Sequence, residues 1–324
     1  MAALPVIVLT PIKNESWILE RFLSVTEQFA DAIIIADQFS TDDSRDIVRR
    51  HPKAILIDNT NPEYDELYRQ QLLIDKAREL YPGKKCLLAL DADEIMTAAS
   101  MQSSFWNALD TYQEGTVLTF EKPDIISPVT KCIRYNSFFT LGYIDDGAPH
   151  TGKKIHSVRV PRKEDSPVVA IEDVKFMHYA LTRTIEYRSR QRLYSVLENI
   201  KNVAPFYHRL LSYSYRLNDY ISKHTITDTP QEWFEGWEQL GINMQTIQSS
   251  EVNTYTEQVL EHIKEYGMKR FYLDDIWDKD WELFCKQSYP AYAGSIRNIP
   301  AYRKALLDVV VLCLKIAKKI KGQS

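Results

Sequence analysis

Four short apolar runs, separated by segments with helical spacing, constrain the fold of this chain more than any other feature. The runs are Leu4–Leu9, Ala32–Ala36, Ala54–Ile57 and Cys86–Leu90. Uninterrupted apolar runs of this length are typical of strands that are buried on both faces. Strands that alternate with helices predict an α/β fold, with a mostly parallel central sheet, helices on both faces and right-handed crossovers.

The pattern changes after the fourth run. Strands are predicted over Val117–Phe120, Cys132–Leu141, Ile155–Val160 and Val168–His178, without long helices between them. Helical spacing then predominates over Thr184–Val203, Phe206–Lys223, Val252–Tyr266 and from Ala301 onward. We therefore expect one α/β domain over residues 1–182 and a mainly helical region over residues 183–324.

Composition excludes some classes of protein. The formal net charge is −4, which gives no basic field for nucleic acid. The four cysteines form no Cys-x-x-Cys pair, so a zinc site or a disulfide framework is not expected. The first apolar run is too short for a signal peptide, and no stretch is apolar enough to span a bilayer. These features predict a cytoplasmic protein.

Polar residues concentrate where the predicted strands end, at Thr10–Glu15, Asp37–Asp42 and Asp91–Glu94. In open α/β sheets, ligands bind at the carboxyl ends of the strands. If the fourth strand continues to Asp93, then Asp91 and Asp93 share a face. Paired carboxylates suit Mg²⁺ or Mn²⁺, which take their other ligands from water and phosphate. The sequence thus predicts a metal site that holds a diphosphate, although an Asp-x-Asp triplet alone also occurs in surface turns.

One ligand could contact all three clusters. Asp37 can accept hydrogen bonds from a base or a ribose, and Thr10, Lys13 and Asn14 can contact the same nucleotide. Asp91 and Asp93 can reach the ribose and the metal. A nucleoside diphosphate that lies across the sheet edge is the ligand these residues predict.

The three segments that carry these residues resemble the inverting family-two glycosyltransferases, of bacterial surface-glycan type and GT-A fold. They are Thr10-Pro11-Ile12-Lys13-Asn14-Glu15, Ile34-Ile35-Ala36-Asp37-Gln38-Phe39-Ser40-Thr41-Asp42 and Leu88-Ala89-Leu90-Asp91-Ala92-Asp93-Glu94. The resemblance implies that Asp37 holds the base, Asp91 the ribose side and Asp93 the metal. The nucleotide-sugar-binding set that it implies is Thr10, Pro11, Lys13, Asn14, Glu15, Asp37, Asp91 and Ala92.

The resemblance also implies an activity. A hexosyl group would pass with inversion from a UDP- or GDP-sugar to a glycan or lipid-linked acceptor, assisted by Mn²⁺ or Mg²⁺, in the synthesis of cell-envelope polysaccharide.

Inversion requires a base that deprotonates the acceptor hydroxyl, and carboxylates that bind metal are too weakly basic for this. Related transferases carry a His-Glu pair, whereas here His156 precedes Ser157. The remaining candidates are Asp145, Asp146, Glu172 and Asp173. Asp146 is slightly favoured because the loop that contains Gly147 could move it toward an acceptor. By residue type alone, Asp145 is an equally good candidate. A polar turn accounts for both equally well.

His178 is a third candidate metal ligand beside Asp91 and Asp93. In the resembling enzymes, a histidine after the last core strand approaches the metal or the diphosphate. Neutral imidazole suits Mn²⁺ better than Mg²⁺. A histidine satisfied within the core is the alternative.

Two features of the second half remain open. Trp233 with Trp237, and Trp277 with Trp281, are spaced to share a helix face, where they would form a sugar platform or part of the core. The apolar run Leu306–Leu314 leads into a lysine-rich end. It suits either contact with the inner face of a membrane or docking on its own domain.

Two other functions are weighed against glycosyl transfer. A sugar-phosphate nucleotidyltransferase normally has a glycine-rich loop after the first strand, and Thr10–Ser16 contains no glycine. A non-catalytic relative that binds a nucleotide or a glycan is consistent with Ser157 in place of glutamate.

Overall fold

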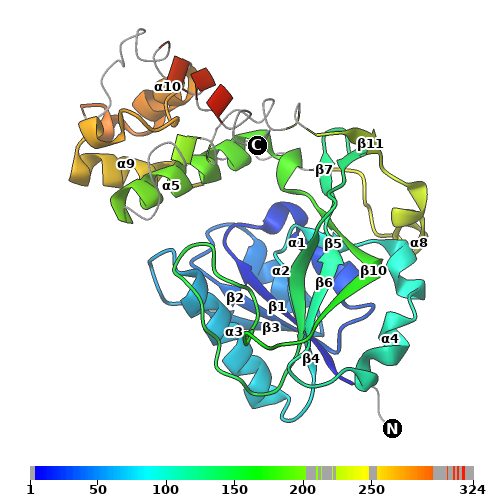
Figure 1. The fold of residues 1–324 in the computed structure, drawn as a ribbon. Helices are drawn as coiled ribbons and strands as arrows, with labels where there is room; N and C mark the ends of the chain where they lie inside the picture. Colours follow the sequence, from blue (N-terminus) through cyan, green and yellow to red (C-terminus); the bar gives the residue numbers. More distant parts are fainter. Residues whose placement is uncertain are drawn as a thin grey trace. The chain divides into compact units, whose positions relative to one another are not determined.

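The computed structural model describes residues 4–201, 209–210, 213, 221, 224–247 and 254–294, with isolated positions at 305, 309–310, 312–313 and 316–317. The chain divides into two compact units (Figure 1). The first comprises Met1–Thr182 and His224–Ser250, and the second comprises Arg183–Lys223 and Glu251–Ser324. The predicted helices Phe206–Lys223 and from Ala301 onward, with the membrane contact proposed for the latter, lie outside the described residues except for single positions.

The described strands all belong to the first unit. They are β1 (Val6–Ile12), β2 (Ala32–Asp37), β3 (Ala54–Asp58), β4 (Cys86–Ala89), β5 (Glu94–Met96), β6 (Val117–Glu121), β7 (Asp124–Ile126), β8 (Lys131–Ile133), β9 (Phe138–Ile144), β10 (Val168–His178) and β11 (Ile226–Asp228). Its α-helices are α1 (Ser16–Thr26), α2 (Ser44–Arg50), α3 (Glu66–Leu80), α4 (Phe105–Ala108) and α8 (Glu235–Gln239).

The strands of the described residues form one sheet in the order β11-β8-β7-β10-β6-β9-β4-β1-β2-β3, with β5 paired to β10. Strands β3, β2, β1 and β4 are parallel neighbours, whereas β9 runs antiparallel to both β4 and β6. The prediction of an α/β fold with parallel strands in its central sheet is confirmed. Because β1 lies between β2 and β4, the carboxyl ends of β2 and β4 are about 10 Å apart.

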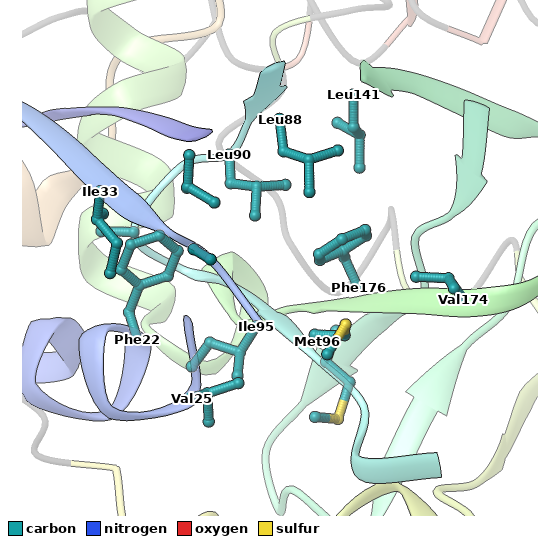
Figure 2. Packing of buried hydrophobic residues seen from close by; sticks show 14 of the residues in the cluster. Phe22, Val25, Ile33, Leu88, Leu90, Ile95, Met96, Leu141, Val174 and Phe176 are labelled. Atoms are coloured by element: carbon teal, nitrogen blue, oxygen red, sulfur yellow. The ribbon is translucent and has the colours of Figure 1, made fainter. Parts of the chain in front are cut away.

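Helices cover both faces of the parallel strands, because alternate strand residues point to opposite sides. On one face, Val8 and Ile33 pack with Phe22 of α1 and Val48 of α2. On the other face, residues such as Ile7 and Ile34 pack with α3. Figure 2 shows the first of these clusters continuing through Leu88 and Phe176 toward β5 and β10. The strands are thus buried on both sides, as their uninterrupted apolar runs predicted.

Two strand predictions were wrong in detail. The segment Cys132–Leu141 contains two strands, β8 and β9, separated by an irregular connection. The segment Ile155–Val160 is not a strand, since its backbone bends and His156 has a φ of 57°. Its polar groups bond to other elements instead, as when Ser157 N donates to Glu66 Oε2 at 2.8 Å.

The described part of the second unit is built from α5 (Thr184–Lys201), α9 (Thr256–Tyr266), α10 (Lys279–Ser288) and short 3₁₀ turns. The segment before α9 is tied to α5, because Glu186 Oε2 accepts from Thr254 Oγ1 at 2.9 Å. Buried Asp274 accepts hydrogen bonds from Asn199 Nδ2 and Arg209 Nε, at 2.5 and 2.9 Å. These polar contacts fix the helices against one another.

The paired tryptophans lie in the cores of their units. Trp233 and Trp237 are 3% and 2% exposed, and Trp237 Nε1 donates to Met96 O at 2.7 Å. Trp277 and Trp281 are also buried, with their ring centroids 5.9 Å apart. They serve packing rather than a surface platform for sugars. In the described part of the chain, no helix combines the length and the apolar character that crossing a membrane requires.

Candidate functional site

The three polar clusters at the strand ends lie together along one edge of the sheet. We call residues 10–15, 37–42 and 91–94 the carboxyl rim. Gln38 N donates to Ile12 O at 2.9 Å, and Leu90 N donates to Leu9 O at 3.1 Å. Asn14 has a φ of 57°, which asparagine tolerates better than most residues, and its Oδ1 accepts from Thr41 N at 2.8 Å. The loops after β1 and β2 are thereby fastened to each other.

Asp37 ends β2 as a buried carboxylate, 2% exposed. Its Oδ2 pairs with Arg45 at 2.7 Å, and Arg45 also pairs with Asp58 at 2.8 Å. The other oxygen, Oδ1, is buried without a hydrogen-bond partner among the described residues, as is Thr10 Oγ1. Buried polar atoms are rarely left unpaired, so two of them beside one strand edge indicate a place for a ligand.

Lys13 is half-buried in the loop after β1. Burial lowers the pKa of its ammonium, and the nearby charge of Asp37 partly opposes this effect. Glu15, at the end of the same loop, accepts from Trp17 Nε1 at 2.7 Å. Pro11 lies within β1, opposite Ala36. Of these residues, Lys13 offers a ligand a charged donor.

The turn after β4 departs from the prediction. The strand ends at Ala89, and a tight turn follows in which Glu94 N donates to Asp91 O at 2.9 Å. Asp91 and Asp93 therefore do not share a strand face. Asp91 is 36% exposed at its side chain, Asp93 only 6%, and the methyl group of Ala92 packs in the core. Ala92 could contact a ligand only through its backbone.

Glu94 is the centre of this turn, and sequence reasoning missed its role. Its side chain is fully buried and accepts from Arg159 at 2.5 and 3.0 Å and from Lys122 at 2.8 Å. Burial opposes its ionisation, but the charges of Arg159 and Lys122 outweigh that and hold its pKa well below the usual range. Glu94 also accepts from Asp91 N at 3.0 Å. It therefore fixes the turn that carries both aspartates.

His178 reaches the same turn from the end of β10. Strand pairing places it opposite Glu94 on one side and Asp124 on the other. Its Nδ1 lies 2.5 Å from Asp124 Oδ1, and its Nε2 lies 3.7 Å from Asp93 Oδ2. Tyr135 Oη donates to the second oxygen of Asp124. Burial and Lys122 oppose protonation of His178, but the carboxylates of Asp93 and Asp124 raise its pKa above the ordinary value.

This arrangement fits a divalent cation with two protein ligands. No group of three His, Cys, Asp or Glu side chains in the described ranges could hold a metal ion. Two ligand atoms that share one ion at about 2.1 Å are roughly 3–4 Å apart, which matches the spacing of Asp93 Oδ2 and His178 Nε2. The bond to Asp124 leaves Nε2 as the free nitrogen, in the manner of carboxylate–histidine–metal sites. Asp91, the third predicted ligand, is instead paired with Arg159 at 2.6 Å.

The predicted bases Asp145 and Asp146 are not brought to the carboxyl rim. They follow Ile144 of β9, which pairs with Cys86 at the start of β4, so they lie at the opposite edge of the sheet. Asp145 is 1% exposed at its side chain and pairs with Arg78 and Lys85 at 2.7 and 2.8 Å. Although burial raises its pKa, these hydrogen bonds lower it overall. Glu172 and Asp173 are exposed residues within β10. The sequence did not show that β9 runs antiparallel to β4, which is what places Asp145 and Asp146 away from the carboxyl rim.

Asp146 gives a prediction for acid stability. Burial opposes its ionisation, but bonds from Lys163, Tyr143 and Ala148 N lower its pKa to about 2. Unfolded aspartate titrates near pH ~3.9, so this stabilisation is present above that pH and disappears as the pH falls through about 2. We expect the free energy of unfolding to fall less steeply between about pH 4 and pH 2 in Asp146→Asn than in the wild type. Urea titrations at each pH would measure this free energy. If it falls equally steeply with pH in the two proteins, the lowered pKa of Asp146 is contradicted.

Comparisons with known proteins give partial likenesses only. No family model and no curated protein matches the chain. Among solved structures, glucosyl-3-phosphoglycerate synthase from Mycobacterium tuberculosis, in complex with Mg²⁺ and UDP, is 16% identical over 38% of this chain and 44% of that chain, with a TM-score of 0.29. The matched part is less than half of that enzyme's length.

Two other structures are similar to the same degree. GalNAc-T7 with UDP, GalNAc and Mn²⁺ is 15% identical over 46% of this chain and 26% of that chain, with a TM-score of 0.28. 4-Diphosphocytidyl-2C-methyl-D-erythritol synthase is 12% identical over 45% and 73%, with a TM-score of 0.29. Likenesses this weak assign neither a family nor an activity to the chain.

Proposed function

We propose that this protein is a glycosyltransferase that moves a sugar from a UDP- or GDP-sugar to a glycan or lipid-linked acceptor, with inversion at the anomeric carbon. The observation that carries the proposal is the presence, along one rim, of the unsatisfied Asp37 Oδ1 and the pair Asp93–His178. The first is an acceptor for a base or a ribose. The second would bind a cation beside a diphosphate.

Asp93 and His178 would hold Mn²⁺ or Mg²⁺, and Asp124 would orient the imidazole. The imidazole ligand favours Mn²⁺. When bound, such an ion neutralises negative charge on a departing nucleoside diphosphate. Asp37 and Thr10 would position the nucleoside, because each has a buried oxygen without a partner among the described residues. Lys13 would donate to ribose or phosphate oxygens, and Asn14 would hold the two rim loops together.

A second candidate is a protein that binds a nucleotide or a glycan without catalysis. The observation that favours it is the location of Asp145 and Asp146 at the edge opposite the rim. Sugar transfer with inversion needs a base beside the acceptor, and these residues do not supply one. Donor binding without turnover against any acceptor would distinguish this candidate from a transferase.

Thermal denaturation with UDP, GDP and their sugar derivatives, each with and without Mn²⁺, tests the proposal. A ligand that binds the folded state raises the melting temperature, and the stabilisation grows with the logarithm of its concentration relative to its Kd. We expect one nucleotide series to stabilise the protein, and more strongly with Mn²⁺. The absence of a shift with any nucleoside diphosphate would contradict the transferase and the nucleotide-binding form of the second candidate, and would leave only glycan binding. Pyrophosphate release from a nucleoside triphosphate would indicate a nucleotidyltransferase.

The contact between Asp124 and His178 predicts an effect on metal affinity. Partners of this kind typically contribute 10–100-fold to metal affinity, so Asp124→Asn is expected to weaken Mn²⁺ binding by about that factor. Tyr135→Phe, which removes the hydroxyl that donates to Asp124, should have a smaller effect. Electron paramagnetic resonance of free Mn²⁺ measures both. Glu121→Gln is a matched control, since Glu121 is a buried carboxylate that pairs with Arg134 and Lys175 instead.

A further inference from the structure

Arg159 occupies the position beside Asp91 where a metal contact was predicted. Its Nη2 lies 2.6 Å from Asp91 Oδ2 and 3.0 Å from Glu94 Oε1. Its Nη1 lies 2.5 Å from Glu94 Oε2 and 3.3 Å from Ala89 O. The guanidinium is thus held at the end of β4 by two carboxylates and a backbone carbonyl.

The Arg159 side chain is not fully covered by the protein. The side chain of Arg159 is 25% exposed, and its Nε–H makes no hydrogen bond with any residue that the structure describes. Asp91, its outer partner, is 36% exposed, whereas Glu94 beneath it is fully buried. Arg159 therefore lies between the buried base of the turn and the open rim.

The charges of Arg159, Lys122, Glu94 and Asp91 balance, so this group as a whole does not repel an anion. Arg159 and Lys122 both converge on Glu94, which neutralises only one of them. Asp91 compensates the other and is itself half-exposed. A planar guanidinium with a free donor binds phosphate oxygens well, because its N–H groups match their geometry.

We infer that Arg159 is a diphosphate-binding residue. The donor's phosphates would then bind between the Arg159 guanidinium, on the Asp91 side, and the metal ion, on the Asp93 side. This inference rests on the proposed function. It explains why Asp91 is paired with an arginine while Asp93 faces a histidine. It also means that part of the affinity for a nucleoside diphosphate persists without metal.

Calorimetric titration of the metal-free protein, in EDTA, with UDP, GDP and the corresponding nucleosides tests the inference. We expect Arg159→Met to weaken diphosphate binding at least about tenfold, which is ~1.4 kcal/mol, and to leave nucleoside binding unchanged. Arg159→Lys should lose less diphosphate affinity, because lysine keeps the positive charge but not the paired N–H donors of the guanidinium. Lys163→Met is the matched control, since Lys163 belongs to the same segment but pairs with Asp146 at the opposite edge. Its affinities should equal those of the wild type.

The outcomes separate this inference from the proposed function. If Arg159→Met keeps the wild-type melting temperature and binds the diphosphate equally well, the inference is overturned while the transferase proposal stands. If Arg159→Met does not fold, Arg159→Lys decides, and an unchanged preference for diphosphate over nucleoside overturns the inference. If the wild type binds neither UDP nor GDP even with Mn²⁺, the proposed function and the inference are both overturned.

Discussion

Asp93→Asn is expected to lower the Mn²⁺-dependent turnover of a nucleotide-sugar donor by about 10²–10³-fold. A bound cation supplies several kcal/mol of charge stabilisation to the departing diphosphate, and each 1.36 kcal/mol is about tenfold in rate. Asp93 is one of the two side chains spaced to hold that cation, and His178 Nε2 lies 3.7 Å from it. Asparagine keeps the size of the side chain but removes its charge. The measurement is the release of UDP or GDP with saturating donor and Mn²⁺.

Asp110→Asn is a suitable control, because Asp110 is an exposed carboxylate outside the rim. It should leave turnover unchanged. The melting temperature of Asp93→Asn should be recorded as well, since Asp93 is buried. Equal turnover in Asp93→Asn and the wild type would refute the metal site, and loss of turnover with unchanged Mn²⁺ affinity would assign Asp93 another role.

Asp145→Asn is expected to destabilise the protein by about 3–5 kcal/mol without loss of catalysis in the molecules that fold. The change leaves the buried Lys85 ammonium and the Arg78 guanidinium without their shared carboxylate. Removing one partner of a buried ion pair typically costs this much. Urea denaturation measures the free energy of unfolding, and the turnover number per folded molecule tests catalysis. These two measurements distinguish a structural carboxylate from a base.

A double variant sharpens this test. If the cost comes from the unpaired Lys85, then Lys85→Met should recover part of the stability that Asp145→Asn loses. A folded Asp145→Asn protein whose turnover falls a hundredfold would show instead that Asp145 acts in the reaction.

The parallel part of the fold was predictable because each of its strands is visible in the sequence as an apolar run. Runs such as Ala32–Ala36 are apolar at every position, which only burial on both faces explains, and β2 follows that run with one residue added. The rim clusters followed from the same logic, since parallel strands end at one edge. The positions of Asp37, Asp91 and Asp93 at the carboxyl rim were therefore predictable from the sequence.

The partners of these residues could not be found in the same way. Arg159 and Glu94 are 65 residues apart, and Asp124 and His178 are 54 apart. No periodicity links positions at such distances. The pairing of β5, β7 and β10 brings Asp124, His178 and Glu94 together, and an irregular segment brings Arg159 to Glu94. The irregular segment that carries Arg159 was predicted to be a strand.

The path of the chain near the second unit has a practical consequence. After Thr182 the chain leaves the first unit, and it returns at His224 to add β11 and to bury Trp237 against Met96. A protein shortened to end at Thr182 would lack that indole and would expose the apolar surface beneath it. Dissection of the α/β unit would therefore require replacing residues 183–223 with a linker, so that the returning stretch is retained.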